Sequence, residues 1–132
     1  MKFEFHKDMQ GFGACQDVNL QLIEYQKDKV LMCKCKKSND FAGIIRTINL
    51  PKNETYTLEV VGSANNLRTF LHVEDAQGKK MYVNYVFLGK DKKSMKLEFT
   101  PTETKIKIGV IMGGDSIATT NDFFVINAFC IR

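Results

Sequence analysis

The stretch LEFTPTETKIKIGVIMGG, from Leu97 to Gly114, decides the fold class. Apolar and polar residues alternate, break at a Pro-Thr turn, alternate again and stop at a Gly-Gly pair. Alternation with a period of two places the apolar side chains on one face of a strand. Two such runs with a short turn between them predict an antiparallel hairpin, with strands over residues 95–100 and 105–112.

The same alternation recurs along the chain with turn residues between the runs, and no long run has helical spacing. The expected strands cover residues 2–6, 18–26, 30–35, 43–50, 55–62, 67–74, 81–88, 95–100, 105–112 and 123–131. Residues 113–122, GGDSIATTND, are expected to form a loop. About ten short strands predict an all-β fold, an antiparallel jelly-roll β-sandwich. Without linkers or repeats, residues 1–132 are expected to form one jelly-roll domain.

The composition is that of an ordinary globular chain, with 44% hydrophobic and 26% charged residues and a net charge of +4. The lysines gather in turns, where they keep strand edges apart. A patch for an anionic partner, such as nucleic acid or a lipid surface, is the alternative. We expect no nucleic-acid partner, and no membrane insertion because no apolar run approaches about 20 residues.

The first residues, MKFEFHKDMQ, alternate in polarity and lack the apolar core of a secretory signal. No signal peptide is therefore expected, and a reducing compartment or a virion is the favoured location. A chain excised from a larger secreted protein would look the same, so that alternative stays open.

Cysteine usage also favours a reducing compartment. The chain has Cys15, Cys33, Cys35 and Cys130, and the C-x-C pair does not have the spacing of a structural zinc knuckle. Free buried thiols are predicted. A disulfide stays open as the alternative, because four cysteines allow three pairings.

Three segments carry a resemblance to a known family: AGIIRTINLPKNETYTLEVVGSAN (42–65), LEFTPTETKIKIGV (97–110) and DFFVINAFCI (122–131). Together they resemble the jelly-roll carbohydrate-binding modules of the galactose-binding-like superfamily, over about residues 42–132. The resemblance implies a non-catalytic module with a glycan partner.

Two features depart from that family. The chain has no Trp, the largest aromatic surface for stacking on a sugar ring. Asn127 stands where the family often has a calcium-ligating Asp, while Glu4 matches the family's opening acidic ligand. The resemblance thus makes Glu4 and Asn127 the candidate ligands of a weak calcium site. Otherwise no cofactor is expected.

Signs of catalysis are absent from the sequence. The two histidines, His6 and His72, lie in expected strands with no nucleophile or carboxylate at a motif spacing. The Gly-Gly-Asp at residues 113–115 lacks the context of a phosphate-binding loop. The chain is therefore predicted not to be an enzyme.

Polar and aromatic residues on neighbouring strands are the candidate ligand-binding residues, because amide and guanidinium donors beside an aromatic ring can bind sugar hydroxyls. They are Arg68, His72, Tyr82, Asn84 and Tyr85. The alternative is that the rings belong to the core and the polar groups are solvated.

The sequence thus predicts a non-catalytic binding module resembling carbohydrate-binding jelly rolls. The alternative is a structural assembly protein, such as a viral minor capsid or decoration protein. The expected partner is a glycan in the first case. In the second it is a protein of the assembly, including a second copy of the chain.

Overall fold

The computed structural model describes residues 1–66, 68–77, 80–82 and 86–132, and of residues 39, 40 and 114–116 it describes the backbone only. The regular elements in these ranges are strands: β1 (Lys2–Glu4), β2 (Gly13–Cys15), β3 (Val18–Tyr25), β4 (Asp28–Cys35), β5 (Asn39–Asn49), β6 (Tyr56–Ala64), β7 (Phe70–Asp75), β8 (Lys93–Phe99), β9 (Lys105–Ala118) and β10 (Phe123–Ile131). The described part of the chain has no helix of the length and apolarity that crossing a membrane requires.

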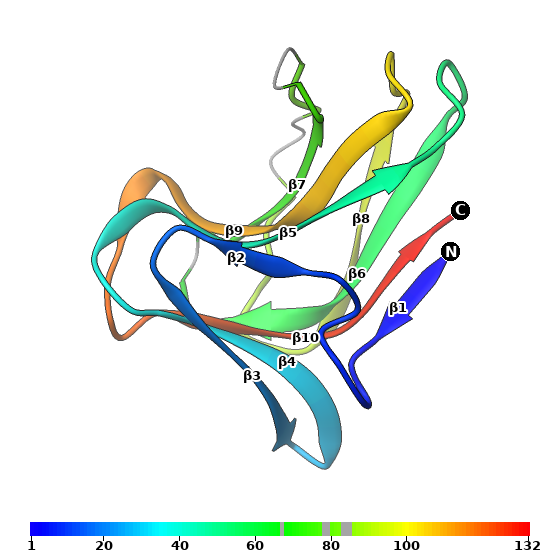
Figure 1. Cartoon of the computed structure of the whole chain (residues 1–132). Coiled ribbons are helices and arrows are strands. Elements are labelled where there is room, and N and C mark those ends of the chain that lie inside the picture. The colour runs from blue at the N-terminus through cyan, green and yellow to red at the C-terminus, as the bar shows by residue number, and fades with distance from the viewer. Residues whose placement is uncertain (67, 78–79, 83–85) are drawn as a thin grey trace.

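The strands form two antiparallel sheets packed as a sandwich (Figure 1). Sheet A has the order β3-β4-β10-β6-β8, with β1 on the same edge of β10 as β4. Sheet B has the order β2-β5-β9-β7. Most neighbours in the sheets are distant in sequence, as in a jelly roll. The prediction of an all-β jelly-roll sandwich is confirmed.

The predicted hairpin is wrong in its pairing. β8 pairs with β6 in sheet A, whereas β9 pairs with β5 and β7 in sheet B. The turn at residues 100–104 therefore crosses between the two sheets, which pack about 10 Å apart. A hairpin and a turn that crosses between the sheets give the same alternation of apolar and polar residues. In both cases each strand buries one of its two faces.

The core lies between the sheets and is built from the inward residue of each alternating pair. Leu58 and Leu97 contribute from sheet A, and Ile44, Ile108 and Val110 from sheet B, all with at most 2% of their surface exposed. Burial of one such aliphatic side chain stabilises the fold by about 1.5–3 kcal/mol. The register of both sheets is fixed by this pattern, because a slip of one residue would turn the apolar set outward.

Rings close the end of the core where the N-terminal segment passes. The Phe12 ring stacks on Phe129 at 4.4 Å between centroids, and Phe3 and Phe5 each meet Phe12 edge-on at 5.8 Å. Residues 1–12 are thereby anchored to β10, although only a three-residue strand pairs there.

Two expectations about the strands need correction, and one short strand was not expected. Residues 13–15 form β2, which is too short to carry an alternation pattern. The run 113–122 was expected to be a loop, but β9 continues to Ala118. The run 81–88 was expected to be a strand, yet its described residues make isolated bridges only, Met81 to Glu74 and Phe87 to Phe70. Residues 83–85 of that run lie outside the described part.

Candidate functional site

The outer face of sheet B is the candidate site. The long strands β5 and β9 curve along their length, so the backbone of this sheet is concave on the side away from sheet A (Figure 1). Residues opposite one another in antiparallel strands share a face. The pairings therefore define the concave face, a name used here for Cys15, Phe41, Gly43, Ile45, Thr47, Phe70, His72, Glu74, Lys107, Gly109 and Ile111.

Glycines form the floor of the concave face. Gly43 in β5 lies opposite Ile111, and Gly109 in β9 lies between Ile45 and His72. A Cβ atom at Gly109 would collide with the carbonyl oxygen of Ile44. The sheet therefore requires glycine here, and the missing side chain leaves room above the middle strand.

Three rings meet above this floor. The centroids of Phe41 and His72 are 5.4 Å apart, those of Phe70 and His72 6.2 Å, and those of Phe41 and Phe70 6.4 Å. Phe41 comes from β5 and the other two from β7, so two strand spacings of about 4.8 Å separate their backbones. The β9 residues opposite Phe41 and His72 are Gly113 and Gly109, so neither ring faces a β9 side chain directly opposite it. We call these three residues the ring cluster.

His72 is the buried member of the ring cluster. Its side chain has no exposed surface, and its Nε2 atom lies 3.2 Å from Oε1 of Glu74. Among the described residues, neither ring nitrogen has a hydrogen-bond partner, so the 3.2 Å approach to Glu74 is a close contact without hydrogen-bond geometry. A buried polar group left without a partner costs about 1–3 kcal/mol and calls for an explanation. A small rotation of Glu74, or a ligand hydroxyl, would provide the missing partner.

A polar row runs beside the ring cluster. Thr47, Lys107 and Glu74 lie opposite one another in β5, β9 and β7. The concave face thus offers ring surface next to a carboxylate, an ammonium and a hydroxyl, which suits a ligand with one apolar face and polar edges.

Cys15 is the one thiol on the concave face among the described residues. Burial raises the pKa of this thiol, the carboxylate of Glu74 raises it further, and Lys107 opposes the shift. The thiol therefore stays protonated near neutral pH and is a poor nucleophile.

Of the candidate ligand residues from the sequence, Arg68 and His72 are linked through rings. The Arg68 guanidinium lies 5.0 Å from the centroid of Phe87. Phe87 forms a β-bridge with Phe70, whose ring contacts His72. These residues therefore lie along one side of the concave face, next to β7. Whether they bind a ligand stays a prediction.

Tyr82 has a different environment. Its hydroxyl donates to Oδ1 of Asp75 at 2.9 Å and accepts from the backbone N–H of Thr102 at 2.9 Å. Its ring packs toward the core, 5.8 Å from Phe99. Burial raises the pKa of Tyr82, so the phenol stays neutral. The hydroxyl already holds two partners, so this geometry favours the alternative interpretation, that Tyr82 supports the structure.

Asn84 and Tyr85, the remaining candidates, lie outside the described residues, so their placement stays a prediction.

The candidate calcium ligands are each engaged with other groups. The two carboxylate oxygens of Glu4 contact Lys2 and His6 at 2.8 Å, and these partners, Lys2 first, lower the pKa of Glu4. Asn127 donates its amide to Asp28 at 3.4 Å. No group of three or more His, Cys, Asp or Glu among the described residues could hold a metal ion. In this arrangement both donors already have other partners, and the weak calcium site stays a prediction.

All four cysteines are free thiols, as the sequence predicted. Cys33 and Cys35 are buried, and Cys15 and Cys130 are partly exposed. Burial raises the pKa of Cys33 far above its ordinary range, which leaves it without nucleophilic character.

Sequence reasoning missed Phe41, Phe70 and Glu74. Phe41 stands in a polar run, SNDFAG, just before an expected strand, and that isolated aromatic residue was the available signal. Phe70 and Glu74 share a strand face with His72, so a period-two reading from His72 would have found both.

Comparison with known proteins identifies the fold. No family model matches the chain, and no curated protein matches it. Among solved structures, the tandem CBM22 domains of Paenibacillus barcinonensis Xyn10C match over 100% of this chain and 43% of theirs, with a TM-score of 0.74 and 14% identity. The carbohydrate-binding module CBM36, in complex with calcium and xylotriose, matches over 100% of this chain and 99% of its own, with a TM-score of 0.63 and 12% identity.

A viral protein is also similar. The enzymatically active domain of tailspike protein 4 from bacteriophage CBA120 matches over 92% of this chain and 19% of its own, with a TM-score of 0.59 and 10% identity. The chain spans less than half of the CBM22 tandem and a smaller part of the tailspike protein. At these identities the likeness establishes the fold. The chain has the jelly-roll fold of carbohydrate-binding modules, as the resemblance implied.

Proposed function

We propose that the chain is a non-catalytic glycan-binding module whose ligand lies on the concave face. The observation that carries this proposal is the ring cluster of Phe41, Phe70 and His72 beside the polar row of Thr47, Lys107 and Glu74. A sugar ring has apolar C–H faces and hydroxyls around its edge. The C–H faces pack against an aromatic ring, and the hydroxyls need charged or polar hydrogen-bond partners.

Phe41 is proposed to provide the stacking surface. It keeps part of its surface exposed, whereas Phe70 is 8% exposed and His72 is 1% exposed. The two buried rings hold Phe41 in place, so little side-chain freedom is lost on binding. A ring held in this way would substitute for the Trp that the chain lacks.

Glu74 is proposed to accept hydroxyl protons from the sugar. Its side chain is 18% exposed, and it lies next to His72 and opposite Lys107. Hydrogen bonds to a charged acceptor are stronger than those between neutral groups. The bound xylotriose of CBM36 makes a xylan oligosaccharide the first ligand to try.

The test is a glycan array followed by isothermal titration of the full chain with the glycan retained. We expect Phe41→Ala to weaken binding by roughly tenfold or more, and Glu74→Gln by several-fold. Tyr25→Ala, on β3 of the other sheet, is the matched control and should bind as the wild type does. Circular dichroism of each variant checks that it is folded. Equal binding by Phe41→Ala and wild type would refute the proposed site.

The assembly function stays a second prediction, and the tailspike likeness is the observation that favours it. A structural assembly protein should form a defined oligomer or bind another protein of its particle. Size-exclusion chromatography with light scattering on the reduced protein distinguishes the two. A monomer that binds a glycan supports the module, and an oligomer that binds none supports assembly.

A further inference from the structure

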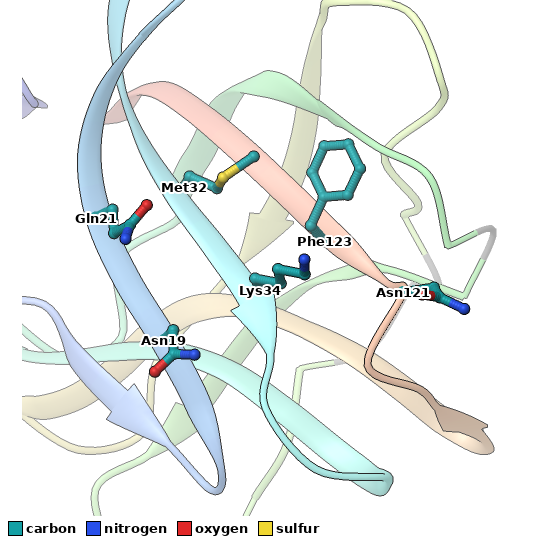
Figure 2. Close-up of a pocket in the computed structure, with 6 residues that line it drawn as sticks. All are labelled: Asn19, Gln21, Met32, Lys34, Asn121 and Phe123. Atoms are coloured by element: carbon teal, nitrogen blue, oxygen red, sulfur yellow. The ribbon is translucent and has the colours of Figure 1, made fainter.

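A groove of about 440 Å³ lies on the outer face of sheet A, away from the concave face. Its volume is within the range of about 300–1,000 Å³ that small-molecule sites occupy. We name it the amide groove; its lining residues are Asn19, Gln21, Met32, Lys34, Asn121 and Phe123. Figure 2 shows Met32 and Lys34 on β4 between the two amides of β3 and the ring of Phe123.

Strand register explains how the groove is assembled. Lys34 lies opposite Asn19 of β3 on one side and opposite Phe123 of β10 on the other. Gln21 lies opposite Met32 in the next outward row. Because these pairings are fixed by the buried inner face of the same strands, the side chains are held in two parallel rows.

The polar groups of the amide groove are not used by the fold. Among the described residues, the side chains of Asn19, Gln21 and Asn121 make no hydrogen bond, and Lys34 makes no ion pair. Asn is also disfavoured in strands, so Asn19 in the interior of β3 has a cost in strand propensity. The three amides provide both donors and acceptors for a ligand.

The chemistry of the lining selects the ligand class. Phe123 and Met32 are partly exposed and offer apolar surface, and the three amides match vicinal hydroxyls. Lys34 is the single charged residue among the lining residues, and it forms no ion pair with a described residue. A ligand that fits all three features has a C–H face, several hydroxyls and one negative charge.

We propose that the amide groove is a second glycan site, which binds a short saccharide through a uronic-acid unit whose carboxylate pairs with Lys34. The inference rests on residues of sheet A and of the turn before β10, and it does not depend on the concave face. Two sites on opposite faces of the sandwich would let one chain contact two glycan strands.

The test is an NMR titration of the full ¹⁵N-labelled chain with trigalacturonate and with its methyl ester, which is the same sugar without the charges. Trigalacturonate should shift the side-chain amide signals of Asn19, Gln21 and Asn121, and the ester should bind more weakly. Lys34→Gln should weaken trigalacturonate binding about three- to fivefold. Phe123→Leu, which keeps an apolar side chain but removes the ring, should weaken it about two- to tenfold.

The matched control is Lys29→Gln, which removes the same charge from β4 outside the groove and should leave binding unchanged. An equal loss in Lys29→Gln and Lys34→Gln would show attraction by net charge only and would overturn the proposal, as would unshifted groove amides. Phe41→Ala separates the two proposals, because it should weaken binding at the concave face and leave trigalacturonate binding intact.

Discussion

Removal of the Tyr82 hydroxyl should destabilise the protein without affecting a bound glycan. Tyr82→Phe keeps the ring against Phe99 but deletes the donor to Asp75 and the acceptor for the Thr102 N–H, both at 2.9 Å. Asp75 is 1% exposed and would keep one described side-chain partner, the Thr102 hydroxyl at 2.9 Å. Tyr25→Phe is the control, because the Tyr25 hydroxyl makes no hydrogen bond to a described residue.

The magnitude follows from what is left without a partner. A buried acceptor that loses its donor costs about 1–3 kcal/mol, and the carboxylate places Tyr82→Phe in the upper half of that range. For a chain of this size, each kcal/mol lowers the melting temperature by about 4 °C. Urea denaturation should therefore give a loss of about 2–3 kcal/mol, and a thermal melt a drop of roughly 8–12 °C.

The reasoning is refuted if Tyr82→Phe and Tyr25→Phe have the same melting temperature. If Tyr82→Phe instead keeps its stability and loses glycan binding, the hydroxyl contacts a ligand and the structural interpretation of Tyr82 is wrong.

Further predictions concern Gly109 on the concave face, the Cys33 thiol and the Glu59 carboxylate. Gly109→Ala should lower the free energy of unfolding in urea by about 1–3 kcal/mol, because its Cβ would meet the backbone of β5. Gly13→Ala has open space around the new Cβ and should leave the stability unchanged. Equal effects of the two substitutions would contradict the requirement for glycine at position 109. Cys33 should resist iodoacetamide at pH 8 in the native protein and react on denaturation, since burial raises its pKa; mass spectrometry that finds it labelled in the native state would contradict this. The pKa of Glu59 is lowered from 4.5, first by the hydrogen bond from Ser94, so its stabilisation is present above pH 4.5 and is lost as pH falls through the lower folded pKa. Carboxyl NMR titration should show that low pKa, and Ser94→Ala should raise it; an ordinary value in the wild type would contradict the assignment.

The alternation in the sequence predicts most strands and their buried faces, but it does not predict which strands pair with one another. Alternation between Leu97 and Ile108 identifies two strands with one buried face each. It does not distinguish a hairpin from a turn that crosses the core, because the same side chains are buried in both. Pairing depends on contacts between distant segments, such as β5 with β9, and these have no local signature.

The same limit applies to the candidate site. His72 was chosen because its residue type is rare and polar, and it was grouped with Arg68, which lies before the start of β7, so that grouping stays a prediction. Phe41 was missed because its contact with His72 depends on the strand order β5-β9-β7, which no local pattern predicts. Tyr82 was selected by residue type, yet its hydroxyl is held by Asp75, a partner seven positions away that no strand period predicts.

The most direct test of the central claim is an NMR titration of the labelled full chain with the glycan that the array retains. The account predicts that the backbone amide shifts concentrate on β5, β7 and β9 around Phe41, His72 and Gly109, and that Phe41→Ala removes them. Shifts confined to other surfaces, or the same shifts in Phe41→Ala, would contradict glycan binding on the concave face.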